Sequence, residues 1–177
     1  MTEEPVIIKT PQATLRPWRM DDAPSVAKYA DNPKVAKNMR DGFPNPYSEE
    51  DAERFLAMAT GDGPALLLAV EIDGEACGGI GVHPFSDVYR KTAEIGYWLA
   101  EPFWGRGIMT EAVKAVVPVA FERFDIVRLQ AGVYEGNIGS MRVLEKAGFE
   151  REAVHRNAIF KNGEFRDEVV FVLFGTS

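Results

Sequence analysis

Short apolar runs and stretches of apolar–polar alternation predict seven strands along this chain. Two pairs of these strands are expected to form hairpins. Asp73-Gly74 and Asn162-Gly163 each stand between two such runs, and both dipeptides are typical of tight turns with positive φ. The predicted strands cover residues 13–18, 64–72, 75–82, 93–100, 128–134, 149–160 and 168–174.

Apolar residues spaced three or four positions apart predict two helices in the N-terminal part of the chain. The first is expected to be capped by Asp21 or Asp22 and to end at Asn32-Pro33. A short helical turn and a proline-containing loop follow. Ser48 then caps the second helix, because an acidic residue stands at the reciprocal position of a capping box.

Two more helices are predicted in the C-terminal part. One follows Gly105-Arg106-Gly107 and ends near residue 124, and the other opens at Asn137 and ends near residue 146. The element order β-α-α-β-β-β-α-β-α-β-β predicts a single α/β domain over residues 1–177. Its sheet is expected to be mixed, with helices on both faces.

The turn Gly105-Arg106-Gly107 is the strongest functional signal in the chain. Glycine adopts positive φ without strain and lets a ligand approach the backbone. The first amides of the following helix have no internal partner, and the positive end of the helix dipole adds to their attraction for an anion. Arg106 adds a positive charge. The turn therefore predicts a pyrophosphate site, although the same turn also serves as a plain strand–helix junction.

Other nucleotide-binding sites fit this turn poorly. Thr110 stands where a dinucleotide-binding fingerprint has its third glycine. The Gly-Lys-Ser/Thr sequence of a P-loop does not follow the turn. A dinucleotide or P-loop site is therefore not expected.

Composition and charge narrow the classes of function. The formal net charge of −7 argues against a broad nucleic-acid-binding surface and suits a cationic substrate such as an amine. Cys77, His83 and His155 lack the spacing of metal ligands, so no metal is expected. The N-terminus lacks an apolar signal core, and no apolar run approaches the ~20 residues that span a bilayer. We therefore expect a cytoplasmic protein with no membrane partner.

Three segments carry recognisable motifs: EIGYWL (94–99) followed by WGRG (104–107), NIGSMRVLEKAGF (137–149) and KNGEFRDE (161–168). Together they resemble the GNAT superfamily of acetyl-CoA-dependent N-acetyltransferases. The likeness is greatest to its Rim-type branch, which includes ribosomal-protein N-terminal acetyltransferases, and it covers nearly the whole chain. It implies the GNAT fold, with a mostly antiparallel central sheet and a splayed pair of strands. Gly107 matches the central glycine of the family's phosphate motif, whereas Trp104 and Met109 replace its first polar and final small residues.

The resemblance implies acetyl-CoA as co-substrate. Its pyrophosphate would lie on the glycine turn, and its pantetheine arm would lie in the gap beside the preceding strand. Asn137 would hydrogen-bond the cofactor, or serve as a helix cap, or do both. The implied cofactor-binding residues are Trp98, Leu99, Ala100, Trp104, Gly105, Arg106, Gly107, Ile108, Met109, Thr110, Asn137 and Ser140.

The same resemblance suggests catalytic residues. Ser140 would donate a proton to the departing thiolate, and Tyr134 is a second candidate for this role. Glu94, at the start of the strand that faces the cleft, is a candidate base that acts directly or through water. Another carboxylate, or water with no dedicated base, stays open as an alternative. An α-amine has a pKa of ~8 against ~10.4 for lysine, so an α-amino acceptor needs only a modest base.

The predicted reaction is acetyl transfer to a primary amine, first of all a protein N-terminal α-amine. The alternatives are a small amine, such as a polyamine, an amino acid or an antibiotic, and a non-catalytic acyl-CoA-binding sensor. Acceptor specificity is expected in the loop 41–47, the first two helices and the last hairpin. Residues 166–168 (RDE) are interpreted as a structural ion pair. Members of the family often form dimers, so the resemblance leaves a homodimer open as one oligomeric state.

Overall fold

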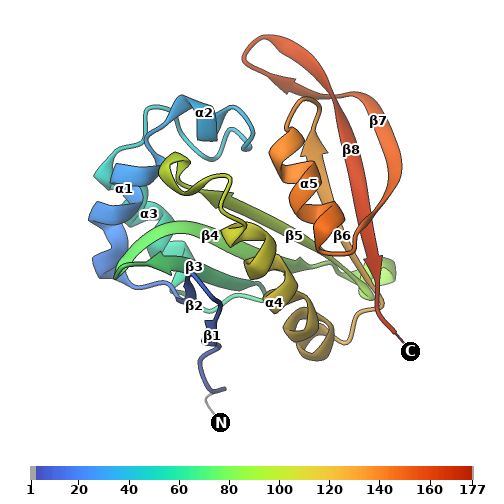
Figure 1. Cartoon of the computed structure of the whole chain (residues 1–177), viewed down its shortest axis with the longest axis horizontal. Coiled ribbons are helices and arrows are strands. Elements are labelled where there is room, and N and C mark those ends of the chain that lie inside the picture. The colour runs from blue at the N-terminus through green and yellow to red at the C-terminus, as the bar shows by residue number, and fades with distance from the viewer. Residues whose placement is uncertain (1–2, 177) are drawn as a thin grey trace.

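The computed structural model describes residues 3–176 and places eight strands in one sheet, with helices packed on both faces (Figure 1). The strands follow the order β1-β2-β3-β4-β5-β6-β8-β7, and β5–β6 is the parallel pair among otherwise antiparallel neighbours. This mixed, mostly antiparallel sheet confirms the predicted fold class. The strands are β1 (Ile8–Lys9), β2 (Thr14–Pro17), β3 (Leu66–Ile72), β4 (Glu75–Pro84), β5 (Thr92–Leu99), β6 (Arg128–Tyr134), β7 (Glu150–Lys161) and β8 (Glu164–Phe174).

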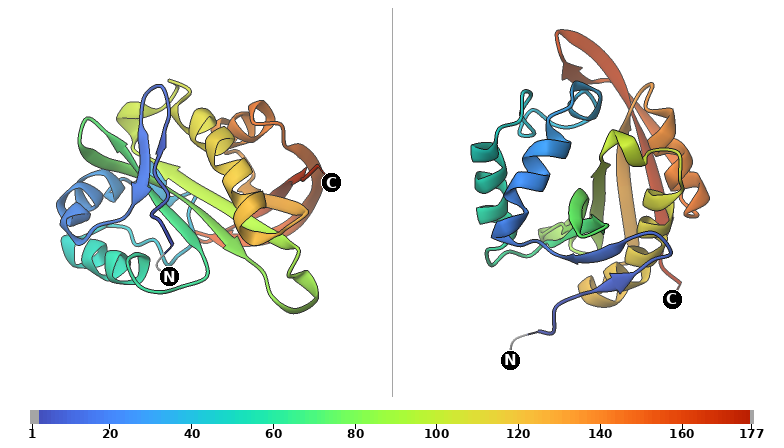
Figure 2. Two further views of the ribbon diagram at one scale, coloured as in Figure 1. Left: turned by 90° about the horizontal axis from the view of Figure 1, so that it is seen from below. Right: turned by 60° about the vertical axis from the view of Figure 1, so that its left-hand side comes forward.

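The helices form two groups. Figure 2 shows α1 and α3 side by side on one face of the sheet and α4 on the opposite face. Within residues 3–176 the chain forms no helix that is both long and apolar enough to cross a bilayer. The helices are α1 (Ala23–Ala30), α2 (Pro33–Ala36), α3 (Glu49–Ala59), α4 (Ile108–Phe124) and α5 (Ile138–Lys146), with short 3-10 turns η1 (Met20–Asp22), η2 (Asp87–Tyr89) and η3 (Glu101–Phe103).

The two N-terminal caps differ in outcome. Ser48 and Asp51 form the predicted capping box, in which the Asp51 amide donates a hydrogen bond to the Ser48 hydroxyl at 3.1 Å. The predicted capping hydrogen bond of the first helix is wrong, although the predicted position is right. Asp22 occupies the N-cap position but makes no capping bond, because its carboxylate accepts hydrogen bonds from the Arg16 guanidinium and the Arg19 amide.

The last hairpin also differs from the prediction. Strand β8 begins at Glu164, directly after the Asn162-Gly163 turn, rather than at residue 168. Residues 164–168 are at least partly exposed, and all but Phe165 are charged, so they lack the run of apolar residues on which the prediction depended. The hairpin tip rises beyond the rest of the sheet (Figure 1), which explains why the paired backbone there needs no apolar face.

Two separate cores lie on the two faces of the sheet. Alternate residues of β3 serve each core, because successive side chains of a strand point to opposite faces. Leu68 and Val70 pack in the larger core, which includes the buried side of α4, whereas Ala69 packs in the smaller core against α1 and α3. The sheet is therefore covered on both sides, and access to its middle depends on local gaps.

One such gap opens where β5 and β6 separate. The two strands pair in parallel only from Thr92–Arg128 to Glu94–Gln130, after which β6 continues to pair with β8 alone. Figure 1 shows the two strands diverging from this point. The second half of β5 therefore has a strand neighbour on one side only.

Candidate active site

The glycine turn at the end of β5 has the backbone that the sequence predicts. Gly105 has φ 73° and Gly107 has φ 76°, and a Cβ on either would meet no atom within 4 Å. The left-handed backbone, rather than lack of room, therefore favours glycine at both positions. Gly107 is the N-cap of α4, and no side chain of residues 3–176 caps this helix. The first amides of α4 are consequently free of helical partners and can bind an anion.

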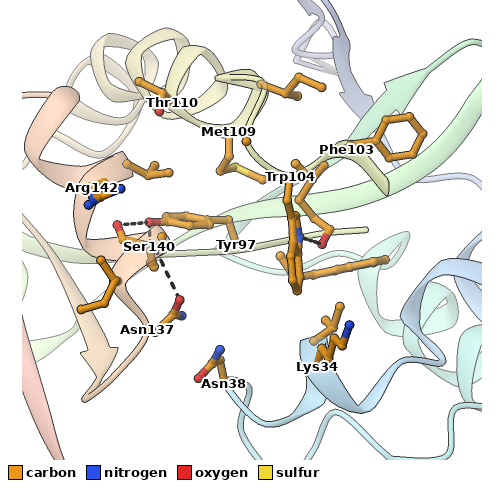
Figure 3. Close-up of a pocket in the computed structure, with 18 of the residues that line it drawn as sticks. Lys34, Asn38, Tyr97, Phe103, Trp104, Met109, Thr110, Asn137, Ser140 and Arg142 are labelled. Carbon is orange, nitrogen blue, oxygen red and sulfur yellow. Dashed lines mark hydrogen bonds between the residues drawn. The ribbon is translucent and has the colours of Figure 1, made fainter. Parts of the chain in front are cut away.

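These amides line a cleft of about 660 Å³ between the end of β5 and the starts of α4 and α5 (Figure 3). Ten of the predicted cofactor-binding residues line it: Trp98, Leu99, Trp104, Gly105, Gly107, Ile108, Met109, Thr110, Asn137 and Ser140. Two do not. The Arg106 guanidinium lies 5.6 Å from the centroid of the Phe103 ring. The amide of Ala100 donates a hydrogen bond to the Cys77 carbonyl of β4.

The two departures from the phosphate motif have different structural roles. Trp104 donates its indole N–H to the Leu99 carbonyl at 2.6 Å, so it ties the turn to the end of β5. Met109 is 5% exposed and forms part of the cleft wall, where Figure 3 shows its side chain. Neither residue removes a backbone donor from the turn.

Strand β5 presents unpaired backbone groups to the gap beside it. The Ala100 amide donates to the Cys77 carbonyl of the β4 side at 2.8 Å. In an antiparallel pair such groups alternate, so the N–H of Trp98 also faces β4, while those of Tyr97 and Leu99 face the opposite side. That side is the gap left by β6. Among the implied cofactor-binding residues Trp98, Leu99 and Ala100, Leu99 is the one whose N–H points there.

The start of α5 lies across this gap from β5. Asn137 caps α5, because its side-chain oxygen accepts a hydrogen bond from the Ser140 amide at 3.4 Å. The cap role of Asn137 is therefore present, and its amide nitrogen stays available for a ligand. The Ser140 hydroxyl lies 2.8 Å from the Tyr97 hydroxyl (Figure 3). Burial raises the pKa of Tyr97 to about 12, although the hydrogen bond with Ser140 opposes this shift.

Tyr97 was missed by sequence reasoning, although one signal for it exists. Ile95, Tyr97 and Leu99 alternate along β5 and so share the face toward α4 and α5. Ile95 and Leu99 are ordinary core residues. A hydroxyl between them is unexpected on a core face, which marks Tyr97 as a residue in need of a polar partner.

A second cleft of about 650 Å³ lies toward α1 and α3 and meets the first. The shared residues belong to β5, α5 and the loop after α2: Asn38, Met39, Tyr97, Trp98, Asn137 and Ser140. Glu94 and Tyr134 line only the second cleft. The three predicted catalytic residues are thus brought together in this cleft, with Ser140 at the junction.

The polar groups of the second cleft are partly neutralised. Glu94 Oε1 lies 3.0 Å from Arg40 Nη2. Burial raises the pKa of Tyr134, whose ring lies 5.5 Å from the Arg166 guanidinium carbon. Partial loss of water contact lowers the pKa of His83, although its side chain is still exposed and the Glu94 carboxylate opposes the shift, so the neutral imidazole is favoured at pH 7. His83 pairs directly with Glu94 across β4 and β5, a relationship that sequence reasoning did not consider.

The interpretation of residues 166–168 as an ion pair is wrong for Arg166. This guanidinium donates instead to the carbonyls of Glu135 and Lys37 and to the Asn38 side chain. It therefore joins β8 to the loop that borders both clefts. Among residues 3–176, no cluster of three or more His, Cys, Asp or Glu side chains is arranged to hold a metal ion.

A family model described as the Acetyltransferase (GNAT) domain matches residues 12–150. The chain belongs to the GNAT family of acetyltransferases. This assignment confirms the family and the enzyme class that the sequence predicted. The diverging strands β5 and β6 and the glycine turn are the features that the resemblance to this family implied.

Individual relatives agree with this assignment. The Putative ribosomal N-acetyltransferase YdaF of Bacillus subtilis is 35% identical over 145 residues, which cover 82% of this chain and 74% of YdaF. The Probable N-acetyltransferase YjcK of the same organism is 48% identical over 83 residues. That match covers 47% of this chain and 46% of YjcK, so it spans less than half of the relative's length.

A solved structure shares the fold. It is described as RimL, a ribosomal L7/L12 alpha-N-protein acetyltransferase in complex with coenzyme A. Its TM-score with this chain is 0.83 at 23% sequence identity, and the superposition covers 96% of this chain and 98% of RimL. The Rim-type likeness inferred from sequence is thus confirmed for the fold.

Proposed function

We propose that this GNAT protein transfers the acetyl group of acetyl-CoA to the N-terminal α-amine of a protein or peptide. The observation that carries the proposal is the junction of the two clefts at Ser140, beside the free edge of β5. One cleft offers anion-binding amides and the other offers candidate bases. A donor and an acceptor that enter from opposite sides would meet at this junction.

The first cleft suits acetyl-CoA. Its floor holds the free amides at the start of α4, which bind a pyrophosphate through hydrogen bonds and the helix dipole. The N–H groups of Tyr97 and Leu99 face the gap beyond, where an amide-containing chain can pair with them as an added strand does. When bound, acetyl-CoA supplies the thioester that the amine attacks and the thiolate that leaves.

The residues at the junction then have distinct roles. The Leu99 N–H is aimed into the gap and is suited to stabilise negative charge on a carbonyl oxygen. The Ser140 hydroxyl, held by Tyr97, donates a proton to the leaving sulfur. Glu94 or His83 accepts the proton of the incoming ammonium group, directly or through water. Tyr134 remains the second proton donor in this scheme.

The charges of the second cleft favour an α-amine over a polyamine. Among the described residues that line it, the carboxylates are Glu94 and Glu168. Glu94 is paired with Arg40, and Glu168 lies 3.6 Å from the imidazole of His155. A polyamine carries several ammonium groups and needs several free carboxylates, whereas an α-amine of pKa ~8 needs one modest base.

A small amine is the second candidate acceptor. The net charge of −7 attracts cations in general and favours such a substrate over an anionic one. A non-catalytic acyl-CoA sensor is the third. A cytoplasmic location and a homodimer stay predictions from the sequence and from the family likeness.

Mass spectrometry after incubation with acetyl-CoA separates these candidates. The acceptors are a set of N-terminal peptides, spermidine and a free amino acid, and the variants are Ser140→Ala and Glu94→Gln. We expect acetylated peptides with the native protein and at least ~100-fold slower transfer with Ser140→Ala, in line with loss of a general acid. Acetylated spermidine with unmodified peptides would favour a small amine as the acceptor. Binding of acetyl-CoA without any turnover would favour the sensor.

A further inference from the structure

The floor of the second cleft contains one bare position. On the face toward α1 and α3, β4 and β5 are paired as Gly79–Trp98, Gly81–Gly96 and His83–Glu94. The middle pair therefore carries no side chain on either strand. This bare position lies between the Trp98 indole on one side and the pair His83 and Glu94 on the other.

Gly96 differs from the glycines around it. A Cβ added to Gly79 would lie 2.9 Å from a ring carbon of Trp18, and one added to Gly81 would lie 2.9 Å from a methyl carbon of Leu67. A Cβ added to Gly132 would lie 2.7 Å from the Glu168 carboxylate. These positions are already covered by neighbouring side chains. Gly96 is exposed, and a Cβ there would meet nothing within 4 Å.

Apolar side chains border the cleft above this bare position. Phe43 packs against Trp98 with ring centroids 5.6 Å apart and against Tyr47 at 5.0 Å. Met39 and Phe85 also line the cleft. The cleft thus combines an open floor at Gly96 with walls that are mainly aromatic and aliphatic, as in sites that hold an apolar group.

Charge adds little to recognition at this position. Glu94, the charged neighbour of Gly96 on the same face of β5, is engaged by Arg40. Glu168, the other carboxylate of the cleft, faces His155 at 3.6 Å. A charged acceptor side chain placed here would lose water and would find both carboxylates already facing another side chain, which makes its burial unfavourable.

We infer that the acceptor carries an apolar side chain on the residue that bears the reacting amine, and that Gly96 provides the space for it. This inference rests on the proposed function, since it concerns the acceptor of that same reaction. Gly96 directly precedes Tyr97, which reaches Ser140 at the junction of the clefts. An amine at the junction therefore places its nearest substituent over the bare floor. Gly96 is a specificity-determining position, and its neighbours Phe43 and Trp98 form the wall.

Peptides that differ only in the first residue test this inference. The set begins with Gly, Ser, Asp, Lys, Leu, Met or Phe, and kcat/KM is measured for the native protein with acetyl-CoA. We expect the peptides beginning with Leu, Met or Phe to exceed those beginning with Ser or Asp by about tenfold or more, the usual value of one or two well-packed apolar groups. Equal kcat/KM values, or a preference for charged first residues, would overturn the inference.

Gly96→Val tests the space itself. Its φ lies outside the left-handed range and valine suits a strand, so the variant is expected to fold. We expect kcat/KM for the Leu-first peptide to fall about tenfold or more, while the value for the Gly-first peptide stays within about twofold. Gly63→Ala is the matched control, because Gly63 also has an open Cβ position and no left-handed φ but lies outside both clefts. An equal loss for all peptides would overturn the role of Gly96.

The acetyl-CoA-induced rise in melting temperature is measured for each variant, and it is expected to be the same for Gly96→Val and the native protein. The proposed function and this inference then fail in different ways. If spermidine is acetylated and no peptide is, the proposed function is wrong and this inference falls with it. If peptides are acetylated without regard to the first residue, the inference alone is wrong.

Discussion

The hydroxyl of Tyr97 lies 2.8 Å from the hydroxyl of Ser140 and 3.2 Å from the carbonyl oxygen of the same residue. The contact joins β5 to α5 at the level where β5 has already left β6. It fixes the orientation of the serine hydroxyl at the junction of the two clefts. Because burial raises the pKa of Tyr97 to about 12, the phenol stays protonated at neutral pH and can keep this hydrogen bond.

Tyr97→Phe removes the hydroxyl and keeps the ring. We expect kcat to fall by about two- to tenfold, since one oriented hydrogen bond contributes roughly 0.5–1.5 kcal/mol. The affinity for acetyl-CoA should change little, because the backbone of β5 is unaltered. Steady-state kinetics and calorimetric titration measure the two quantities separately. A kcat equal to that of the native protein would show that Ser140 does not depend on this contact.

The double variant of Tyr97→Phe with Ser140→Ala checks whether the two residues act as a unit. Residues that work through one another give non-additive losses. We expect the double variant to be about as slow as Ser140→Ala alone. Multiplied losses would mean that the tyrosine acts independently of the serine.

Gly107 offers a test of the anion-binding turn. Its φ of 76° makes an alanine there strained by roughly 1–2 kcal/mol, and the altered turn should also displace the first amides of α4. We expect Gly107→Ala to lower the melting temperature and to weaken acetyl-CoA binding about tenfold or more. Gly74→Ala is the matched control, because Gly74 has φ 82° and an open Cβ position but lies in the β3–β4 hairpin turn. It should be destabilised to a similar extent and bind acetyl-CoA normally, so equal affinities in the two variants would contradict the assignment.

Local patterns of the sequence were sufficient to predict several elements of the fold. Strand β6 has the predicted bounds, α4 ends at the predicted residue, and both hairpin turns lie where Asp73-Gly74 and Asn162-Gly163 stand. Each of these depends on interactions within a few residues, such as positive φ at a turn or the three-to-four spacing of a helix. The glycine turn was predictable for the same reason.

The contacts that assemble the site were beyond such reasoning. Tyr97 and Ser140 are 43 positions apart in the chain, and Arg40 and Glu94 are 54 apart. These pairs form only because β5 separates from β6 and because the loop after α2 returns over the sheet. Periodicity placed Glu94 on a strand, but it did not indicate that an arginine from that loop neutralises its carboxylate.

Arg166 is predicted to position the loop that borders both clefts. It donates to the carbonyl of Lys37 at 3.1 Å, to the side chain of Asn38 at 3.3 Å and to the carbonyl of Glu135. Arg166→Ala removes all of these bonds. We expect KM for the peptide acceptor to rise several-fold, since the loop carries Phe43 into the acceptor cleft, while the affinity for acetyl-CoA changes less.

Arg166→Lys serves as the control for charge. Lysine keeps the charge but lacks the planar fork of donors that reaches several acceptors at once. It should behave like Arg166→Ala if geometry matters and like the native protein if charge alone matters. Unchanged acceptor KM in both variants would show that the loop holds its position without this residue.

The buried pair of Arg16 and Asp22 provides a test of stability. The guanidinium donates to both carboxylate oxygens, at 2.9 Å and 2.7 Å, and both side chains are less than 10% exposed. Asp22→Asn removes one of the two carboxylates that face the guanidinium, since Arg16 also pairs with Glu71. Breaking a buried pair costs about 3–5 kcal/mol, and the Glu71 carboxylate that remains should keep the loss near the lower end of that range. Asp21→Asn is the matched control. Its carboxylate is 83% exposed and 3.9 Å from Arg19, so the change should stay within about 0.5 kcal/mol.

The loss of stability in Asp22→Asn is expected to depend on pH. Burial by itself raises the pKa of Asp22, but the hydrogen bonds from Arg16 and the Arg19 amide together hold it below its ordinary value. A carboxyl with a lowered folded-state pKa contributes stability above its unfolded pKa of about 3.9 and loses that contribution as the pH falls through the folded value. Urea unfolding of the native protein and Asp22→Asn should therefore differ most near pH 7, and the difference should begin to shrink as the pH falls below about 4. A difference that stays constant down to pH 3 would mean that the loss in Asp22→Asn arises from packing and not from the carboxylate charge.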